Sequence, residues 1–298
     1  KNNKKTWKID QHNYNKHIKP IFANKRLSQI TFPDIESLMT SMKKGTSQRG
    51  RPYSDATRKH ILLLLSRLYS LAEKWDMYEG KNPCKKVKAP RLNNEITEHL
   101  SDDELARLLV VLENWPNRMS ACFVQIALYT GLRRGEIFKL KWSDVFIDRE
   151  KPFMVIRAPE GQEGPKGGKD VILPLSEKAV ETLRQVPREH EGCEWIFYGK
   201  GGAQRVDFKG PWQRIRATAN LQVTKGFSGF RLHGLRHHFA RQLVSNGVDL
   251  YTVGTLLSHK SSKMTRRYAH LSDEALRAAV EKSDKLSTGR KMKKDDKS

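Results

Sequence analysis

The sequence predicts a mainly α-helical protein with a small β-sheet, an α+β fold, arranged in two domains. Apolar residues recur at helical spacing over most of the chain, and two β-rich runs flank a glycine-rich turn near its middle. A basic segment with two prolines, at about residues 80–94, separates a first domain over residues 1–92 from a second over residues 95–287. The length of 298 residues allows each domain to bury its own core.

In the first domain the pattern predicts helices near residues 6–19 and 33–44, a loop-like segment over 43–52, and a long helix that begins at Ser54. Pro33 suits the first turn of the second helix. The long helix is expected to turn one apolar stripe to the core, formed at spacings of four and three residues by Ile61, Leu65, Leu68, Ala72 and Trp75.

In the second domain Ser101 and Glu104 have the spacing of a capping box at a helix start. Helices are expected near residues 101–114, 117–129, 134–140, from Ser176 onward, 211–220, from His233 to Asn246, 249–258 and 272–286. Two or three strands, including residues 152–158 and 170–175, should form a hairpin with a glycine-rich tip. The polar, basic tail over 288–298 is expected to be disordered.

The charge of the chain indicates a polyanionic partner. The formal net charge is +23 and the pI about 10.0, which favours nucleic acid over a membrane surface, and no apolar run approaches the length of a membrane span. Residues 1–92 carry 21 Lys and Arg against 7 Asp and Glu, a net charge of +14 that leaves +9 for the rest. The first domain is therefore expected to be the denser electrostatic footprint for DNA.

The three cysteines are widely spaced and form no C-x-x-C pair. This argues against a zinc site or a disulfide framework and fits a reducing cytoplasm. The glycine-rich segment over 161–168 is not a phosphate-binding P-loop, because Lys169 is followed by Asp170 rather than Ser or Thr. No metal or nucleotide cofactor is expected.

Six residues of the second domain form a candidate active site: Arg133, Lys166, His233, Arg236, His259 and Tyr268. They lie in the segments TGLRRGE (130–136), GPKGGKDVILPL (164–175), HGLRHHFA (233–240) and LLSHKSSKMTRRYAH (256–270), where SSK indicates a turn. Taken singly, each has an ordinary structural interpretation: an arginine or lysine on the surface, a tyrosine in the core. The histidines at 237 and 238 are interpreted as structural.

Together these residue types suit attack on a phosphodiester by a protein hydroxyl. Two guanidinium groups can hold the phosphate bidentately and take up the charge that develops in the transition state. A tyrosine with a pKa of about 10 needs a base or a positive potential before it can attack. The leaving 5′-oxygen needs a proton, which a lysine or histidine can supply.

That set of motifs, in that order, resembles the tyrosine recombinase (phage integrase) family, and the first domain resembles its helical core-binding domain. The resemblance implies that Arg133 and Arg236 clamp the phosphate and that Tyr268 forms a 3′-phosphotyrosine bond. It implies that Lys166 is the general acid, with Lys169 as runner-up on the same hairpin tip. His233 and His259 match the two histidine positions, and Glu136 an acidic position that supports the first arginine.

The resemblance implies a site-specific DNA recombinase, of the phage or integrative-element type, that integrates or excises a mobile element. The alternatives are a type IB topoisomerase-like enzyme and a non-catalytic DNA-binding regulator. Expected partners are double-stranded DNA at core recombination sites, further copies of the chain in a tetramer on DNA, and accessory DNA-bending proteins, with no membrane. The expected location is the cytoplasm, at the nucleoid, for a bacterial or phage-encoded protein. The family member expected here lacks an arm-binding domain before the first domain, and the start at Lys1 is compatible with removal of one.

Overall fold

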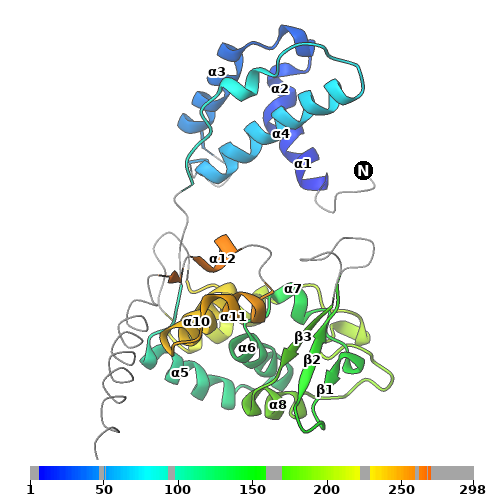
Figure 1. The fold of residues 1–298 in the computed structure, drawn as a ribbon, viewed down its shortest axis with the longest axis vertical. Helices are drawn as coiled ribbons and strands as arrows, with labels where there is room; N and C mark the ends of the chain where they lie inside the picture. Colours follow the sequence, from blue (N-terminus) through cyan, green and yellow to red (C-terminus); the bar gives the residue numbers. More distant parts are fainter. Residues whose placement is uncertain are drawn as a thin grey trace, which may run out of the picture. The chain divides into compact units, whose positions relative to one another are not determined.

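The computed structural model describes residues 7–46, 50, 52–92, 98–158, 170–221, 229–258, 262–266 and 268–269. The chain divides into two compact units, residues 1–94 and 95–298, each of which is described by itself (Figure 1). Helices dominate both units, and the second also holds a small sheet, as the sequence predicts. The predicted fold class is therefore confirmed. Among the described residues, no helix has the length and apolar character needed to span a membrane.

The first unit contains α1 (Trp7–Asn13), a π-helical turn η1 (Tyr14–Ile18), α2 (Lys19–Phe22), α3 (Phe32–Lys44) and α4 (Asp55–Lys74), with 3₁₀ turns η2 (Leu27–Gln29) and η3 (Pro83–Lys86). The single helix predicted near 6–19 is thus a longer helical stretch with a π turn inside it. Pro20 explains the turn, because it has no backbone N–H and cannot donate the hydrogen bond of a regular α-helix. The preceding residue, Lys19, donates its backbone N–H five residues back, to the Tyr14 carbonyl, which is the π-helical pattern.

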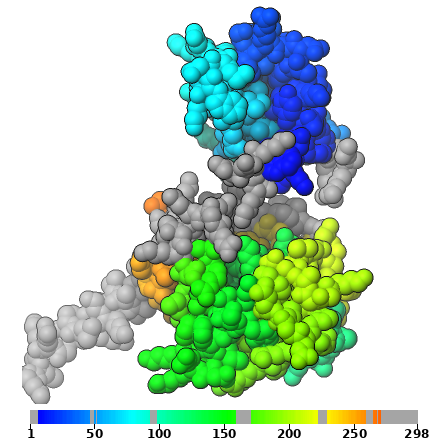
Figure 2. Space-filling view, turned by 90° about the vertical axis from the view of Figure 1, so that its right-hand side faces the viewer, coloured from blue at the N-terminus to red at the C-terminus, as the bar shows by residue number. Residues whose placement is uncertain are grey.

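The core of the first unit lies between α3 and α4. Ile35, Ile61 and Leu65 are at most 1% exposed, and the buried Tyr69 hydroxyl donates to the Leu27 carbonyl at 3.0 Å. Most of the stripe predicted for α4 therefore faces the core. Trp75 is the exception: it follows the last helical turn and is 62% exposed, so its assignment to the core was wrong. In the space-filling view, the blue and cyan atoms of this unit form one body (Figure 2).

The helices of the second unit are α5 (Asp102–Glu113), α6 (Arg118–Thr130), α7 (Arg134–Ile137), α8 (Glu177–Arg184), α9 (Lys209–Thr218), α10 (Leu232–Ser245), α11 (Leu250–Leu256) and α12 (Ser262–Arg266), with 3₁₀ turns η4 (Trp142–Asp144) and η5 (Lys200–Gly202). The predicted capping box is present at the start of α5, where the Glu104 N–H donates to Ser101 Oγ and the Ser101 N–H to Glu104 Oε2. The helix predicted over 134–140 ends earlier, at Ile137.

The sheet is an antiparallel meander in the order β1 (Val145–Phe146), β2 (Phe153–Ile156) and β3 (Val171–Pro174). Ile156 pairs with Val171 at the loop end of the β2–β3 hairpin. Beyond this pair, Arg157 contacts the carboxylates of Asp144 and Asp170 at 2.7 Å each, and the Ala158 N–H donates to Asp170. These contacts hold together the two ends of the loop that joins β2 to β3. The predicted tip, including Lys166 and Lys169, lies outside the described residues.

Helix α6 is the central element of the second unit and packs against both α10 and α8 (Figure 1). Ten of its thirteen residues are buried. It ends at Gly131, which has a φ of +63°. A Cβ at this position would lie 2.5 Å from Phe239 and 2.8 Å from Leu257. Only glycine fits, because the left-handed conformation and the close approach of α10 and α11 both exclude a side chain.

Candidate active site

Helix α10 brings three candidate side chains to one face. His233, Arg236 and His237 are at helical positions i, i+3 and i+4, which lie above one another on a helix surface. His233 is exposed in the first turn, whereas Arg236 is 4% exposed and His237 6% exposed. The ring centroids of His233 and His237 are 4.9 Å apart in an edge-to-face arrangement. The helix therefore carries an exposed imidazole, a buried guanidinium and a buried imidazole along one stripe.

The turn after α6 places Arg133. Gly131 ends α6, and the next residue, Leu132, is buried in the core. Arg133 follows as the N-cap residue of the short helix α7. The Glu136 carboxylate accepts the Arg133 backbone N–H and one guanidinium N–H, both at 2.7 Å. One carboxylate thus fixes the main chain and the side chain of Arg133 together.

Arg236 is held from two sides. Its guanidinium donates to the Gly131 carbonyl at 2.8 Å and to the Leu257 carbonyl. Burial, and next the positive charge of Arg133, lower the pKa of Arg236 to about 10, while Glu136 and Tyr268 act in the opposite direction. At neutral pH the group therefore remains charged. These contacts tie the end of α6, helix α10 and the end of α11 to one buried cation.

Glu136 lies between the two arginines. Its carboxylate is 2.7 Å from Arg133 and 3.9 Å from Arg236. Two guanidinium groups with one carboxylate leave a net positive charge, and the proximity of the like charges is costly unless an anion approaches. The arrangement is thus suited to bind a phosphate group.

Tyr268 is buried against α10 and α11. It is 2% exposed and packs with Ala240, Val244, Val253 and Leu257. Its hydroxyl forms a 2.5 Å hydrogen bond with His237 Nδ1. His237 therefore contacts the candidate nucleophile, a contact that the sequence pattern did not indicate. The spacing of four residues from His233 was the signal that could have placed both imidazoles on the same face.

The neighbouring His238 is structural, as the sequence predicts. It is 3% exposed, and its Nδ1 accepts the backbone N–H of Leu100 at 3.3 Å. Burial, and next the charge of His99, lower the pKa of His238 below its usual value. The neutral imidazole thus joins α10 to the segment that leads into α5.

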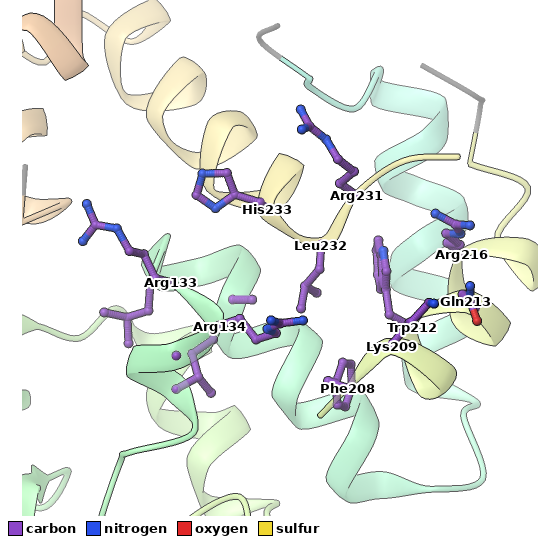
Figure 3. Close-up of a pocket in the computed structure, with 14 residues that line it drawn as sticks. Arg133, Arg134, Phe208, Lys209, Trp212, Gln213, Arg216, Arg231, Leu232 and His233 are labelled. Carbon is purple, nitrogen blue, oxygen red and sulfur yellow. The ribbon is translucent and has the colours of Figure 1, made fainter. Parts of the chain in front are cut away.

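A pocket of about 530 Å³ opens beside Arg133 and His233. Figure 3 shows these two side chains on one side of it and Lys209, Gln213 and Arg216 from α9 on the other. Arg134 and Arg231 also line the pocket, so its wall is strongly cationic. The sequence pattern indicated none of the α9 residues as part of the site. They are brought there by the packing of Trp212, whose ring N–H donates to the Phe230 carbonyl at 3.0 Å.

Two of the six candidate residues, Lys166 and His259, lie outside the described residues. Described residues flank both of them. Asp170, four residues after Lys166, bonds to Arg157 and Ala158 at the loop end of the β2–β3 hairpin. Leu257, two residues before His259, supplies the carbonyl that accepts from Arg236. The turn expected from SSK is in part the short helix α12, which begins at Ser262.

Comparison with known proteins identifies the family of the chain. Residues 98–275 match the model of the phage integrase family. The chain belongs to the phage integrase family. A tyrosine recombinase of Thermosipho africanus is 26% identical over 263 residues, which is 88% of this chain and 87% of the relative. The predicted family and the class of enzyme, a tyrosine recombinase, are confirmed.

Solved structures of two integrases have the same fold. The Tn1549 transposon integrase in complex with transposon right end DNA superposes with a TM-score of 0.71 at 18% identity, covering 95% of each chain. The lambda integrase tetramer bound to a Holliday junction gives 0.65 at 22% identity, covering 89% of this chain and 72% of that one. Among the described residues of this family member, no group of three His, Cys, Asp or Glu side chains could hold a metal ion.

Proposed function

We propose that this chain is a site-specific DNA recombinase that cuts and rejoins DNA strands through a covalent bond between Tyr268 and a 3′-phosphate. The observation that carries the proposal is that the guanidinium groups of Arg133 and Arg236 converge on Glu136. Tyr268 packs beside α10, the helix that carries Arg236. A phosphate clamp next to a protein hydroxyl is the arrangement that phosphodiester transesterification requires.

The proposed reaction gives each candidate residue a role. Arg133 and Arg236 bind the non-bridging oxygens, and the Tyr268 oxygen attacks phosphorus as the bond to the 5′-oxygen breaks. Lys166 protonates the leaving oxygen, and His233 and His259 take part in acid–base and phosphate contacts. The energy of the broken ester bond is kept in the phosphotyrosine, so the attack of a 5′-hydroxyl reverses the step without any nucleotide cofactor.

Residues 1–92, with the linker at about 80–94, are proposed as the core-type DNA-binding domain, and residues 95–287 as the catalytic domain. The net charge of +14 on residues 1–92 supports the first assignment. The solved relatives are bound to DNA, one of them as a tetramer, which supports core-site DNA and further copies of the chain as partners. The likeness to a transposon integrase supports integration or excision of a mobile element. The proposed place of action is the bacterial nucleoid.

The test is the loss of one oxygen atom. Tyr268→Phe should abolish covalent protein–DNA adducts on a nicked suicide substrate, observed on a denaturing gel, and should leave DNA affinity nearly unchanged because most of the interface is electrostatic. Tyr251→Phe is the matched control, since Tyr251 is 78% exposed on α11. Adducts in Tyr268→Phe at the level of the control would refute the assignment. Exchange of strands between two sites, rather than relaxation alone, would separate a recombinase from a topoisomerase.

A further inference from the structure

We propose that His237 is a further catalytic residue, which accepts the phenolic proton of Tyr268 as the tyrosine oxygen attacks the phosphate. The proposal rests on the nucleophilic role given to Tyr268 above. It adds a proton acceptor to a set of residues in which the resemblance had implied Lys166 as the general acid and matched His233 and His259 to the family's two histidine positions.

The first argument is geometric. His237 Nδ1 lies 2.5 Å from the Tyr268 hydroxyl oxygen, within the distance at which a proton can pass directly between the two atoms. Both residues are almost fully enclosed, at 6% and 2% exposure. Their rings are 6.1 Å apart between centroids and tilted by 50°, so the imidazole nitrogen points to the hydroxyl and the rings do not stack.

The second argument is the chemical need. With a pKa of about 10, only roughly one phenol in a thousand is ionised at pH 7, so the attacking oxygen requires a base. A neutral imidazole can take that role near neutral pH. The charge of Arg236, one residue earlier on α10, assists by stabilising the phenolate oxygen that forms. The interaction with Tyr268 favours the charged form of Arg236.

The third argument is that the three histidines of α10 have different positions and contacts. His233 is exposed in the first turn and lines the cationic pocket together with Arg133, on the side where the phosphate would enter (Figure 3). His237 lies one turn further into the protein, against the hydroxyl. His238 is directed elsewhere, because its Nδ1 accepts from the Leu100 backbone. Of the three histidines on α10, His237 is the one in contact with the nucleophile.

The step balances as a proton transfer coupled to substitution. The Tyr268 O–H bond breaks as a bond from that proton to His237 Nδ1 forms. The same oxygen bonds to phosphorus, and the bond from phosphorus to the 5′-oxygen breaks, with its proton coming from a separate donor, Lys166 under the proposed function. In ligation the phenolate leaves phosphorus and recovers the proton from His237. The acting tautomer therefore has a bare Nδ1 and a proton on Nε2.

The first experiment compares His237→Asn with His238→Asn in the full chain. Asparagine places a polar group near the former Nδ1 but cannot accept a proton at neutral pH. We expect His237→Asn to slow single-turnover cleavage of the suicide substrate by about 10²–10⁴-fold at unchanged DNA affinity. His238→Asn keeps an acceptor for the Leu100 N–H and should slow it by less than about tenfold. Equal, small effects of both variants would overturn the proposal.

The second experiment separates proton transfer from positioning. Tyr268 is replaced by a fluorinated tyrosine whose phenol is already ionised at the assay pH. No proton then has to be removed, so the His237→Asn defect should shrink to about tenfold or less. A defect of the same size with both tyrosines would assign His237 to positioning alone. Adducts that persist in Tyr268→Phe would instead refute the proposed function itself, so the two failures are distinguishable.

A third measurement needs no substitution of His237, and so decides the matter if its variants fail to fold. In the chain labelled with ¹⁵N-histidine, the nitrogen chemical shifts distinguish a bare Nδ1 from a protonated one. We expect a bare Nδ1 for His237 in the free protein at the assay pH, with a shift that changes in Tyr268→Phe. An Nδ1 that carries the proton, and hence donates to Tyr268, would overturn the proposal.

Discussion

Replacement of Arg236 by lysine tests the clamp most directly, because it keeps the charge and removes the geometry. The guanidinium is 4% exposed and donates to the carbonyls of Gly131 and Leu257 on opposite sides. A lysine ammonium is a single point at the end of a flexible chain and cannot reproduce the planar fork. Arg236→Lys should therefore lose both the tether to the two carbonyls and the bidentate contact with phosphate.

The magnitudes follow from these two losses. Removal of one oxyanion donor costs about 3–4 kcal/mol, so cleavage should slow by about 10²–10³-fold. A buried carbonyl left without a donor costs about 1–3 kcal/mol of folding free energy. For a unit of about 200 residues each of these kcal/mol lowers the Tm by roughly 2–4 °C. The variant should thus be measurably less stable and much less active.

The assay measures single-turnover cleavage at a temperature where both proteins are folded, together with thermal unfolding. Arg241→Lys is the matched control, since Arg241 lies five residues further along α10, on a different face of the helix. It should change the cleavage rate by less than about threefold. Arg236→Lys with near-wild-type cleavage would refute the role of the buried guanidinium, whatever happens to the Tm.

Three other outcomes are expected. Lys166→Ala should be slow on normal DNA and recover on a substrate with sulfur at the 5′-bridging position, because a thiolate leaves without a proton; equal defects on both would move the donor to His233 or Lys169. If the chain contacts about 6–10 phosphates, its DNA affinity should fall by about 10³–10⁵ between 50 and 200 mM salt, and residues 95–298 alone should show a flatter dependence, since a net charge of +14 has been removed. An unchanged slope would show that the first unit does not hold DNA. Because burial lowers the pKa of His238, the unfolded chain protonates this group first as the pH falls. Stability should thus be full above about pH 6.5 and decrease from there toward the lowered pKa. His238→Asn should weaken that decrease and His190→Asn, at an exposed position, should not; identical profiles for all three proteins would contradict it.

Much of the fold could be predicted because its signals are local. The capping residues Ser101 and Glu104 set the start of α5, and Gly131 sets the end of α6, through hydrogen bonds and backbone angles that involve only sequence neighbours. Two predictions were wrong at positions where the local sequence pattern alone did not determine the structure. Trp75 continued an apolar spacing past the last turn of α4, where no partner covers it, and the π turn before Pro20 changed a predicted single helix.

The sequence by itself predicted the chemical groups of the candidate site, because two arginines, a lysine, two histidines and a tyrosine in ordered motifs are visible without coordinates. Only the tertiary structure decided how they are paired. His237 and His238 are adjacent in sequence but about 100° apart around α10. That rotation directs one imidazole to the Tyr268 hydroxyl and the other to the Leu100 backbone. Likewise, Glu136 contacts Arg236 as well as Arg133 because α6 and α10 pack together. The local spacing of residues cannot predict a contact between two residues so far apart in the sequence.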